Sequence, residues 1–218
     1  MTPYYVFFSG AVAVGKSSLM ASMKLMLARK KFIMIKEFID YQPNIGELLL
    51  SQNKAGKISD FEFQNYVLDC YEAQLNKISN EEFVLMERHP LEALGVFVKC
   101  AIFKMSFEYQ RELEDRIHRI MEKFQIPDLR ECYMNKYNSS LFTIKSIVED
   151  FNVQLIKHYS LTDEQRKYGD ICYLETNVDD MILRIVQRGR QSEKTLNGAD
   201  LASFASAYEM FFKNLKLI

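Results

Sequence analysis

The sequence predicts an α/β fold in which a parallel sheet of four to five strands is flanked by helices. Apolar, β-branched and aromatic segments of strand length alternate along the chain with longer amphipathic segments of helical period. A glycine-containing loop joins the first strand-like segment to the first helix-like segment. Charged residues stand directly after two later apolar segments, where ligands bind in an open parallel sheet.

The composition limits the classes of protein to which the chain can belong. Its 218 residues, 48% of them apolar, suit one domain over residues 1–218, and the net charge of −1 predicts no binding to nucleic acid or to a membrane. No apolar run is long enough for a membrane span, and the N-terminus does not resemble a signal peptide. The three histidines show no metal-ligand spacing. We expect a soluble cytoplasmic protein with reduced, mostly buried cysteines, namely Cys70, Cys100, Cys132 and Cys172.

The strongest motif is the phosphate-binding pattern G-x-x-x-x-G-K-[ST]. It runs from Gly10 to Ser17, between a predicted strand over residues 4–9 and a predicted helix over 18–29. This order of elements presents backbone N–H groups and a helix N-terminus to a polyphosphate. Lys16 would contact the transferred phosphate and Ser17 would ligate Mg²⁺, which indicates a nucleoside triphosphate as the ligand. The expected phosphate contacts are Gly10, Ala11, Val12, Ala13, Val14, Gly15, Lys16, Ser17 and Ser18.

Two further strands are predicted over residues 31–36 and 82–87, and both end at a glutamate. Glu37 could accept the proton of a hydroxyl that attacks the γ-phosphate. Glu87 could bind Mg²⁺ directly or through water, and Arg88 could neutralise phosphate charge or orient Glu37. Solvated charges at strand ends explain each residue equally well when it is considered alone.

Most of the remaining segments are predicted to be packing elements. Helices are expected over residues 44–52, 61–76, 91–103, 105–124, 141–156 and 199–215, and residues 130–140 are polar and predicted to be irregular. Gln64 lies near a helix start, where its amide could pair with a nucleobase edge, although a surface glutamine is the commoner case.

A fourth strand, over residues 170–175, is followed by a helix with Thr176 or Asn177 as its N-cap. Arg184 and Arg188 share a face of this helix, and Arg190 follows a glycine. A basic helix end is the simpler interpretation, but beside a phosphate loop these arginines favour a lid over residues 184–193 that closes on a triphosphate.

In combination, these signals resemble the deoxynucleoside kinase family, which includes herpesvirus-type thymidine kinases. The resemblance rests on the loop at residues 10–17, Glu37, Phe63-Gln64, the arginine-rich lid and Glu87-Arg88-His89-Pro90. The last of these is similar to the Asp-Arg-His-Pro segment of herpesvirus thymidine kinases. The fold implied by the resemblance is the P-loop kinase fold.

The resemblance implies a role for each site residue. Glu37 would be the general base for the nucleoside 5′-hydroxyl, and Arg88 would connect it with the phosphates. Gln64 would pair with the base, and small Ala93 would leave room for the 5-methyl group of thymidine. Ser17 and Glu87 would bind the metal, and the lid residues Arg184, Arg188 and Arg190 would stabilise the transferring phosphoryl group. Glu193 would contact the 3′-hydroxyl of the sugar. The pocket would be shaped by Phe63, Tyr66 and Tyr71. A homodimer is also implied, in host cytosol or nucleus if the chain is viral.

Three features differ from the family pattern. The spacing between Arg88 and the lid is longer, with the excess placed in a helical insertion over residues 105–138. Residues 49–53 contain no tyrosine for the substrate site, and residues 215–218 can form at most a short fifth strand.

The sequence favours an ATP- and Mg²⁺-dependent deoxynucleoside kinase, with thymidine as its first candidate substrate, over three other functions. A thymidylate kinase needs arginines near the second helix, and residues 37–73 contain none. A GTP-dependent switch needs D-x-x-G and N-K-x-D motifs, which are absent from the sequence. A catalytically inactive nucleotide-binding scaffold would be expected to have lost Lys16, Glu37 or a lid arginine, and all are present.

Overall fold

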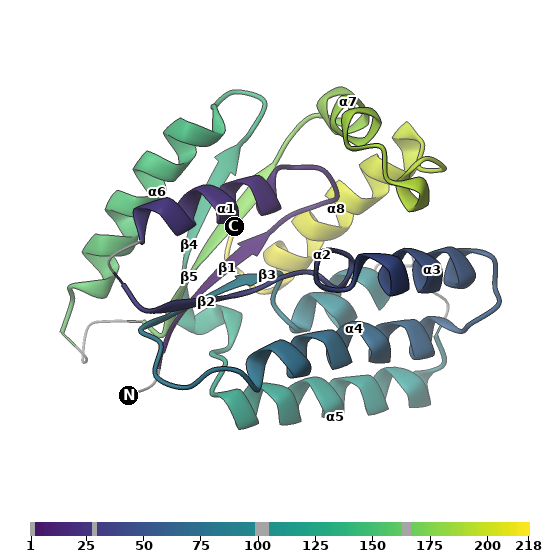
Figure 1. The fold of residues 1–218 in the computed structure, drawn as a ribbon, viewed down its shortest axis with the longest axis horizontal. Helices are drawn as coiled ribbons and strands as arrows, with labels where there is room; N and C mark the ends of the chain where they lie inside the picture. Colours follow the sequence, from purple (N-terminus) through teal and green to yellow (C-terminus); the bar gives the residue numbers. More distant parts are fainter. Residues whose placement is uncertain (1–2, 28–29, 99–104, 163–166) are drawn as a thin grey trace.

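The computed structural model describes residues 3–27, 30–98, 105–162 and 167–218. It confirms the predicted α/β fold, with a parallel sheet in the order β2-β3-β1-β5-β4 (Figure 1). The strands are β1 (Tyr4–Ser9), β2 (Phe32–Ile35), β3 (Phe83–Glu87), β4 (Cys132–Asn138) and β5 (Gly169–Glu175). In register, Phe8 of β1 stands beside Glu87 of β3, and Ser9 stands beside Tyr173 of β5. This register brings the loops that follow β1, β3 and β5 together at one edge of the sheet.

Helices cover both faces of the sheet (Figure 1). One face carries α1 (Lys16–Met26) and α6 (Ile144–Tyr159), and the other carries α4 (Asp60–Leu75), α5 (Phe107–Phe124) and α8 (Gly198–Asn214). The short α2 (Phe38–Tyr41), α3 (Pro43–Lys54) and α7 (Val178–Arg188) follow the carboxyl ends of β2 and β5. A π-helix, η1 (Ala93–Val98), and two 3₁₀ turns, η2 (Leu129–Glu131) and η3 (Gln191–Glu193), complete the described elements.

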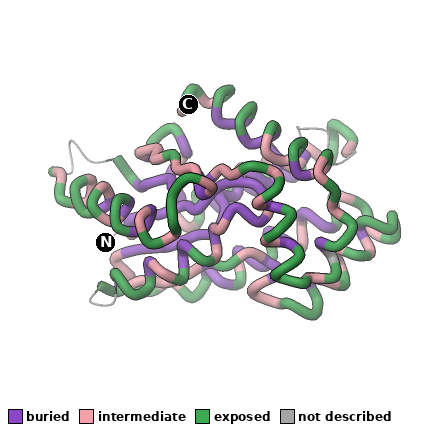
Figure 2. The backbone as a smooth tube through the Cα atoms, turned by 90° about the horizontal axis from the view of Figure 1, so that it is seen from above, coloured by how far each residue is buried: buried purple, intermediate pink, exposed green. Residues whose placement is uncertain are grey.

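The side chains of β1 show how the layers pack. The Phe8 ring lies 6.2 Å from that of Phe151 on α6, whereas the Phe7 ring lies 4.6 Å from that of His89 on the opposite face. On that opposite face the Tyr5 hydroxyl also donates to the carbonyl oxygen of Phe124, at 2.6 Å. Every residue of β1 is buried, and the central strands form the buried middle of the molecule (Figure 2). A strand covered on both faces has an uninterrupted apolar sequence, as residues 4–8 do.

The fifth strand lies where the sequence predicted irregular structure. β4 pairs with β5 from Cys132 beside Gly169 to Asn138 beside Glu175. It is an edge strand whose residues are mostly half-buried, so its sequence lacks the apolar run that marks a central strand. Residues 215–218, for which the sequence allowed at most a short strand, form a turn after α8 and no strand.

Residues 105–138, predicted to be an insertion, contribute α5 and β4 to the body of the domain. Arg116 of α5 contacts the carboxylates of Asp69 and Glu72 on α4, and Leu113 and Ile117 are fully buried. The excess length relative to the family stays a prediction. The segment itself belongs to the sheet and its covering layer.

The helix predicted over residues 91–103 is a π-helix where the structure describes it, over Ala93–Val98. Residues 99–104 lie outside the described residues, as does Arg29 of the first predicted helix. Cys70, Cys132 and Cys172 are buried free thiols, as predicted, and Cys100 lies outside the described residues. Within the described ranges, no helix is long and apolar enough to cross a membrane.

Candidate active site

The loop between β1 and α1 has the geometry of a phosphate cradle. Gly10 (φ 134°) and Gly15 (φ 106°) adopt left-handed conformations that favour glycine. A Cβ atom on Gly10 would lie 2.2 Å from the carbonyl oxygen of Leu174, so this position also requires the absence of a side chain. Gly15 is the N-cap of α1, and the first N–H groups of that helix are therefore available to an anion at the loop.

Lys16 lies inside this loop and is buried. Its Nζ donates to the carbonyl oxygens of Gly10 (3.1 Å) and Ala11 (2.8 Å). Burial lowers the pKa of Lys16 to about 8, and the positive charge of Arg88 acts in the same direction. A phosphate oxygen is a stronger partner than these carbonyls because the hydrogen bond would then join two charged groups.

Arg88 lies between the phosphate loop and Glu37 and contacts both. Its Nε donates to Glu37 Oε1 at 2.8 Å, and its Nη1 donates to the Gly10 carbonyl oxygen at 2.9 Å. Burial raises the pKa of Glu37, but the charges of Arg88 and Lys16 outweigh burial and hold that pKa at about 2. Glu37 is therefore an anion at the mouth of the phosphate loop.

Two residues that the sequence did not single out hold Arg88 from its other side. Glu92 is fully buried, and its Oε2 lies 3.7 Å from Arg88 Nη1. Tyr208 of α8 donates its hydroxyl to Glu92 Oε2 at 2.7 Å and accepts a hydrogen bond from Arg88 Nη1. Arg88 has a left-handed backbone (φ 69°), an uncommon state for a residue with a side chain. Glu92 stabilises this conformation as well, since its Oε1 accepts from the backbone N–H of His89.

His89 has a structural position. Its Nδ1 accepts a hydrogen bond from the Leu91 backbone N–H (3.1 Å), so its Nε2 carries the proton and donates to the Pro127 carbonyl oxygen (2.9 Å). Burial lowers the pKa of His89 to about 4, which keeps the ring neutral.

Three oxygen-bearing side chains meet at the start of α1. Ser17 Oγ donates to Glu87 Oε1 at 3.0 Å and lies 3.4 Å from Asp40 Oδ2. Glu87 is buried, and its Oε2 has no hydrogen-bond partner among the described residues. Burial, followed by the negative charge of Glu37, raises the pKa of Glu87 to about 7. A hydroxyl and carboxylates with an unpartnered buried oxygen fit Mg²⁺, and Asp40 joins the two residues expected from the sequence.

The predicted lid has one carboxylate at its centre. Glu193 Oε1 accepts from Arg188 Nη1 (2.9 Å) and Arg190 Nη1 (3.3 Å), and Arg190 also pairs with the Asp40 carboxylate. Arg184 differs from the prediction because it does not line the pocket. It donates to the Ala13 carbonyl oxygen (3.2 Å) and to Ser139, and so connects α7 with the outer side of the phosphate loop.

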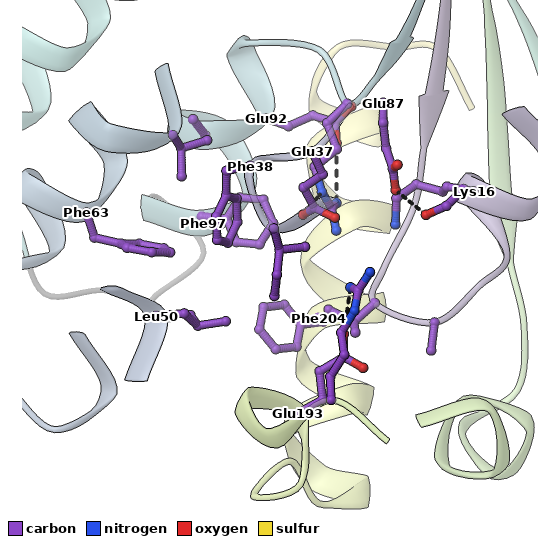
Figure 3. Close-up of a pocket in the computed structure, with 18 of the residues that line it drawn as sticks. Lys16, Glu37, Phe38, Leu50, Phe63, Glu87, Glu92, Phe97, Glu193 and Phe204 are labelled. Carbon is purple, nitrogen blue, oxygen red and sulfur yellow. Dashed lines mark hydrogen bonds and ion pairs between the residues drawn. The ribbon is translucent and has the colours of Figure 1, made fainter. Parts of the chain in front are cut away.

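A pocket extends from these charged groups to an apolar end (Figure 3). Lys16, Glu37 and Glu87 mark the charged end, and Phe63 and Leu50 lie at the other. Within the described ranges, the lining includes these predicted site residues: Val12, Ala13, Gly15, Lys16, Ser17, Glu37, Phe63, Gln64, Tyr71, Glu87, Arg88, Ala93, Arg188, Arg190 and Glu193. Gly10, Ala11, Val14 and Ser18 belong to the phosphate loop or to α1 but are outside the lining.

Several residues at the apolar end differ from expectation. Tyr66 does not line the pocket, and its hydroxyl donates to Gln42 Oε1 at 3.3 Å. Phe97 of η1 and Phe204 of α8 line the pocket without having been predicted, because no local pattern separates them from core aromatics. Lys54 lines it from α3. Glu92 could have been suspected from its position four residues after Arg88.

The predicted nucleobase contacts occupy suitable places. Gln64 is almost fully buried, and its amide forms none of the hydrogen bonds found between described residues. Tyr71 donates its hydroxyl to the Glu87 backbone oxygen at 3.0 Å and so connects α4 with the end of β3. Ala93 opens η1 as a small side chain beside them.

Comparisons with known proteins agree with this geometry. A family model described as deoxynucleoside kinase matches residues 6–141, and no curated protein matches. The structure of deoxyadenosine kinase from M. mycoides with bound dATP superposes with a TM-score of 0.53 at 19% identity, covering 97% of this chain and 85% of that one. The same enzyme with product dCMP and a flexible dCDP gives 0.54 at 19% identity, covering 96% and 84%. These similarities confirm the fold, and because the family model spans more than half of the sequence, the chain belongs to the deoxynucleoside kinase family.

Proposed function

We propose that this protein transfers the γ-phosphoryl group of ATP to the 5′-hydroxyl of a deoxynucleoside, with Mg²⁺ and with thymidine as the first candidate substrate. The observation that carries this proposal is the path of contacts from Glu37 through Arg88 to the phosphate loop, at the charged end of a pocket whose other end is aromatic. A nucleoside placed with its base at the aromatic end would direct its 5′-hydroxyl toward Glu37.

Glu37 would accept the proton of the attacking hydroxyl. With a pKa of about 2, which the positive charges of Arg88 and Lys16 hold down, its carboxylate is a weak base. A triphosphate would bring negative charge to both cations, weaken their effect on Glu37 and raise its proton affinity. Phosphoryl transfer demands little covalent help, so positioning and charge neutralisation by Lys16, Arg188 and Arg190 would supply most of the rate enhancement.

Mg²⁺ would be held near Ser17 and Glu87 together with phosphate oxygens. Within the described residues, no three His, Cys, Asp or Glu side chains form a metal cage by themselves. This agrees with Mg²⁺, which is commonly held by one or two carboxylates, water and substrate phosphates. When bound, the ion would neutralise the charge that develops on the β- and γ-phosphates.

The preference for thymidine rests on the apolar end of the pocket. Gln64 offers one donor and one acceptor to a base edge, and neither is engaged by another described side chain. Ala93 leaves space for a methyl group, and the Tyr71 hydroxyl is already committed to the Glu87 backbone.

The decisive experiment measures ADP release from Mg·ATP with single acceptors: thymidine, deoxycytidine, deoxyadenosine, deoxyguanosine and thymidylate. We expect turnover on thymidine, and at least a thousandfold loss of kcat in both Lys16→Ala and Glu37→Gln, with unchanged thermal unfolding apart from small shifts. Turnover on thymidylate would identify a monophosphate kinase. ATP binding without turnover on any acceptor would leave a nucleotide-binding scaffold. Retained activity in Glu37→Gln would reject Glu37 as the base.

The homodimer implied by the family resemblance and the cytoplasmic location expected from the composition stay predictions. Light scattering at micromolar concentration would test the first, with a mass near twice the 25.6 kDa of one chain as the expected result.

A further inference from the structure

Asp40 stands at the metal-binding end of the site, although no sequence motif includes it. It belongs to α2, the short helix that begins directly after Glu37. Its Oδ2 lies 3.4 Å from Ser17 Oγ. The same Ser17 hydroxyl donates a hydrogen bond to Glu87. Side chains from α1, from α2 and from the end of β3 therefore bring oxygen atoms to one point.

The Glu87 carboxylate indicates what this point is built to hold. It is 1% exposed, and within the part of the chain that the structure describes only one of its two oxygens has a hydrogen-bond partner. An unpartnered carboxylate oxygen removed from water costs free energy unless a cation approaches it. Asp40 brings a second carboxylate to the same hydroxyl, which favours a cation there still more.

Arg190 of the lid already neutralises part of the negative charge at this point. It forms an ion pair with the Asp40 carboxylate and a second one with Glu193. Both side chains of the Arg190–Asp40 pair are mostly buried, at 19% and 28% exposure. The Arg190 guanidinium therefore lies where a bound metal ion and the triphosphate would also place their charges.

We propose that Asp40 is a ligand of the Mg²⁺ site, directly or through one water, and that Arg190 holds its carboxylate until Mg·ATP enters. Asp40 would then leave Arg190 for the metal site, and the released Arg190 guanidinium would move to the triphosphate, so that metal binding and lid closure are coupled. This inference rests on the proposed use of Mg·ATP, but it concerns metal affinity and can fail independently of the reaction.

The test measures binding of Mn²⁺, a paramagnetic substitute for Mg²⁺, by electron paramagnetic resonance. Titrations are made with the protein alone and with a non-hydrolysable β,γ-imido analogue of ATP. In Asp40→Asn we expect the Mn²⁺ affinity to fall about tenfold or more in both titrations. In Arg190→Gln we expect tighter Mn²⁺ binding to the protein alone, because a competing cation has been removed. The double variant should bind as weakly as Asp40→Asn.

Asp69→Asn is the matched control. Asp69 pairs with Arg116 on the surface of α4 and is 65% exposed, so the same change of charge there should leave Mn²⁺ affinity unaltered. Wild-type Mn²⁺ affinity in Asp40→Asn would overturn the proposal. Should that variant not fold, unchanged affinity in Arg190→Gln alone would overturn it. Absence of kinase activity on every nucleoside, combined with the expected Mn²⁺ results, would reject the proposed reaction and leave this inference standing.

Discussion

Replacing Glu92 by glutamine removes one charge from the centre of the site while keeping the shape of the side chain. Glu92 Oε1 accepts from the Ser9 hydroxyl and the His89 backbone N–H, and Oε2 accepts from Tyr208 and faces Arg88 Nη1. A glutamine has only one acceptor oxygen. In either orientation, its NH₂ group meets a donor that cannot turn away, either the His89 N–H or the Arg88 guanidinium.

The structure gives the size of this effect. At 3.7 Å and an effective dielectric constant of about 20, the Arg88–Glu92 attraction is about 4.5 kcal/mol. An uncharged amide costs less free energy to bury than a carboxylate, and this offsets part of the lost attraction. We therefore expect the free energy of unfolding to fall by about 3 kcal/mol, in the range found when buried ion pairs lose one partner. For a chain of this length, that corresponds to a Tm lowered by roughly 6–12 °C.

The assay is reversible denaturation followed by circular dichroism, with Glu209→Gln as the matched control. Glu209 makes a solvated ion pair with Lys213 on the surface of α8, so the same substitution there should change the unfolding free energy by less than about 1 kcal/mol. A double-mutant cycle with Tyr208→Phe should give a coupling of about 1 kcal/mol or more.

Turnover provides a second readout. Because Arg88 orients Glu37, Glu92→Gln should also lower kcat by about tenfold to a hundredfold at a temperature where the variant is folded, with a smaller change in KM for ATP. An unfolding free energy in Glu92→Gln as close to wild type as that of Glu209→Gln would refute the reasoning. It would mean that Glu92 is already protonated in the folded protein, so that glutamine imitates it.

Two further predictions concern the pocket and its support. Gly95→Ala should destabilise the protein by about 1–3 kcal/mol, because a Cβ atom there would lie 2.1 Å from the ring of Phe211. Gly198→Ala, where the nearest atom would be 3.6 Å away, serves as the control and should be neutral or slightly stabilising in thermal unfolding. Gln64→Leu should raise KM for the nucleoside at least tenfold without lowering Tm, since its amide has no described protein partner to lose. An unchanged KM in steady-state kinetics would exclude Gln64 from base recognition.

Local sequence could encode the order of elements around the phosphate-binding motif, and the structure has that order, with β1, the glycine loop and α1 in succession. The phosphate loop requires a strand, glycines and a helix start within about fourteen consecutive residues, so all of its sequence requirements are local. Glu37, Glu87 and Arg88 were identified because parallel strands end at a common edge, so residues after different strands meet there without further information. Asn177 caps α7, as one of the two predicted alternatives.

The elements that the sequence missed are those with weak local signals. β4 lies at the sheet edge, where most of its residues are half-buried and it lacks the apolar run of a central strand. The π-helical form of η1 has the same apolar composition as an α-helix. Its departure from α-helical geometry accompanies the close approach of Gly95 to Phe211 on α8, which no local pattern reports.

The sequence by itself determined that the chain has a phosphate loop, a carboxylate after β2, a Glu-Arg pair after β3 and an arginine-rich segment after β5. Only the tertiary structure decided how these groups are held. It placed Tyr208 and Glu92 behind Arg88, Asp40 between Ser17 and Arg190, and Arg184 on the outer side of the loop. The partners in these contacts come mostly from different helices and strands, and their meeting depends on how the layers pack, which local periodicity and motif spacing do not specify.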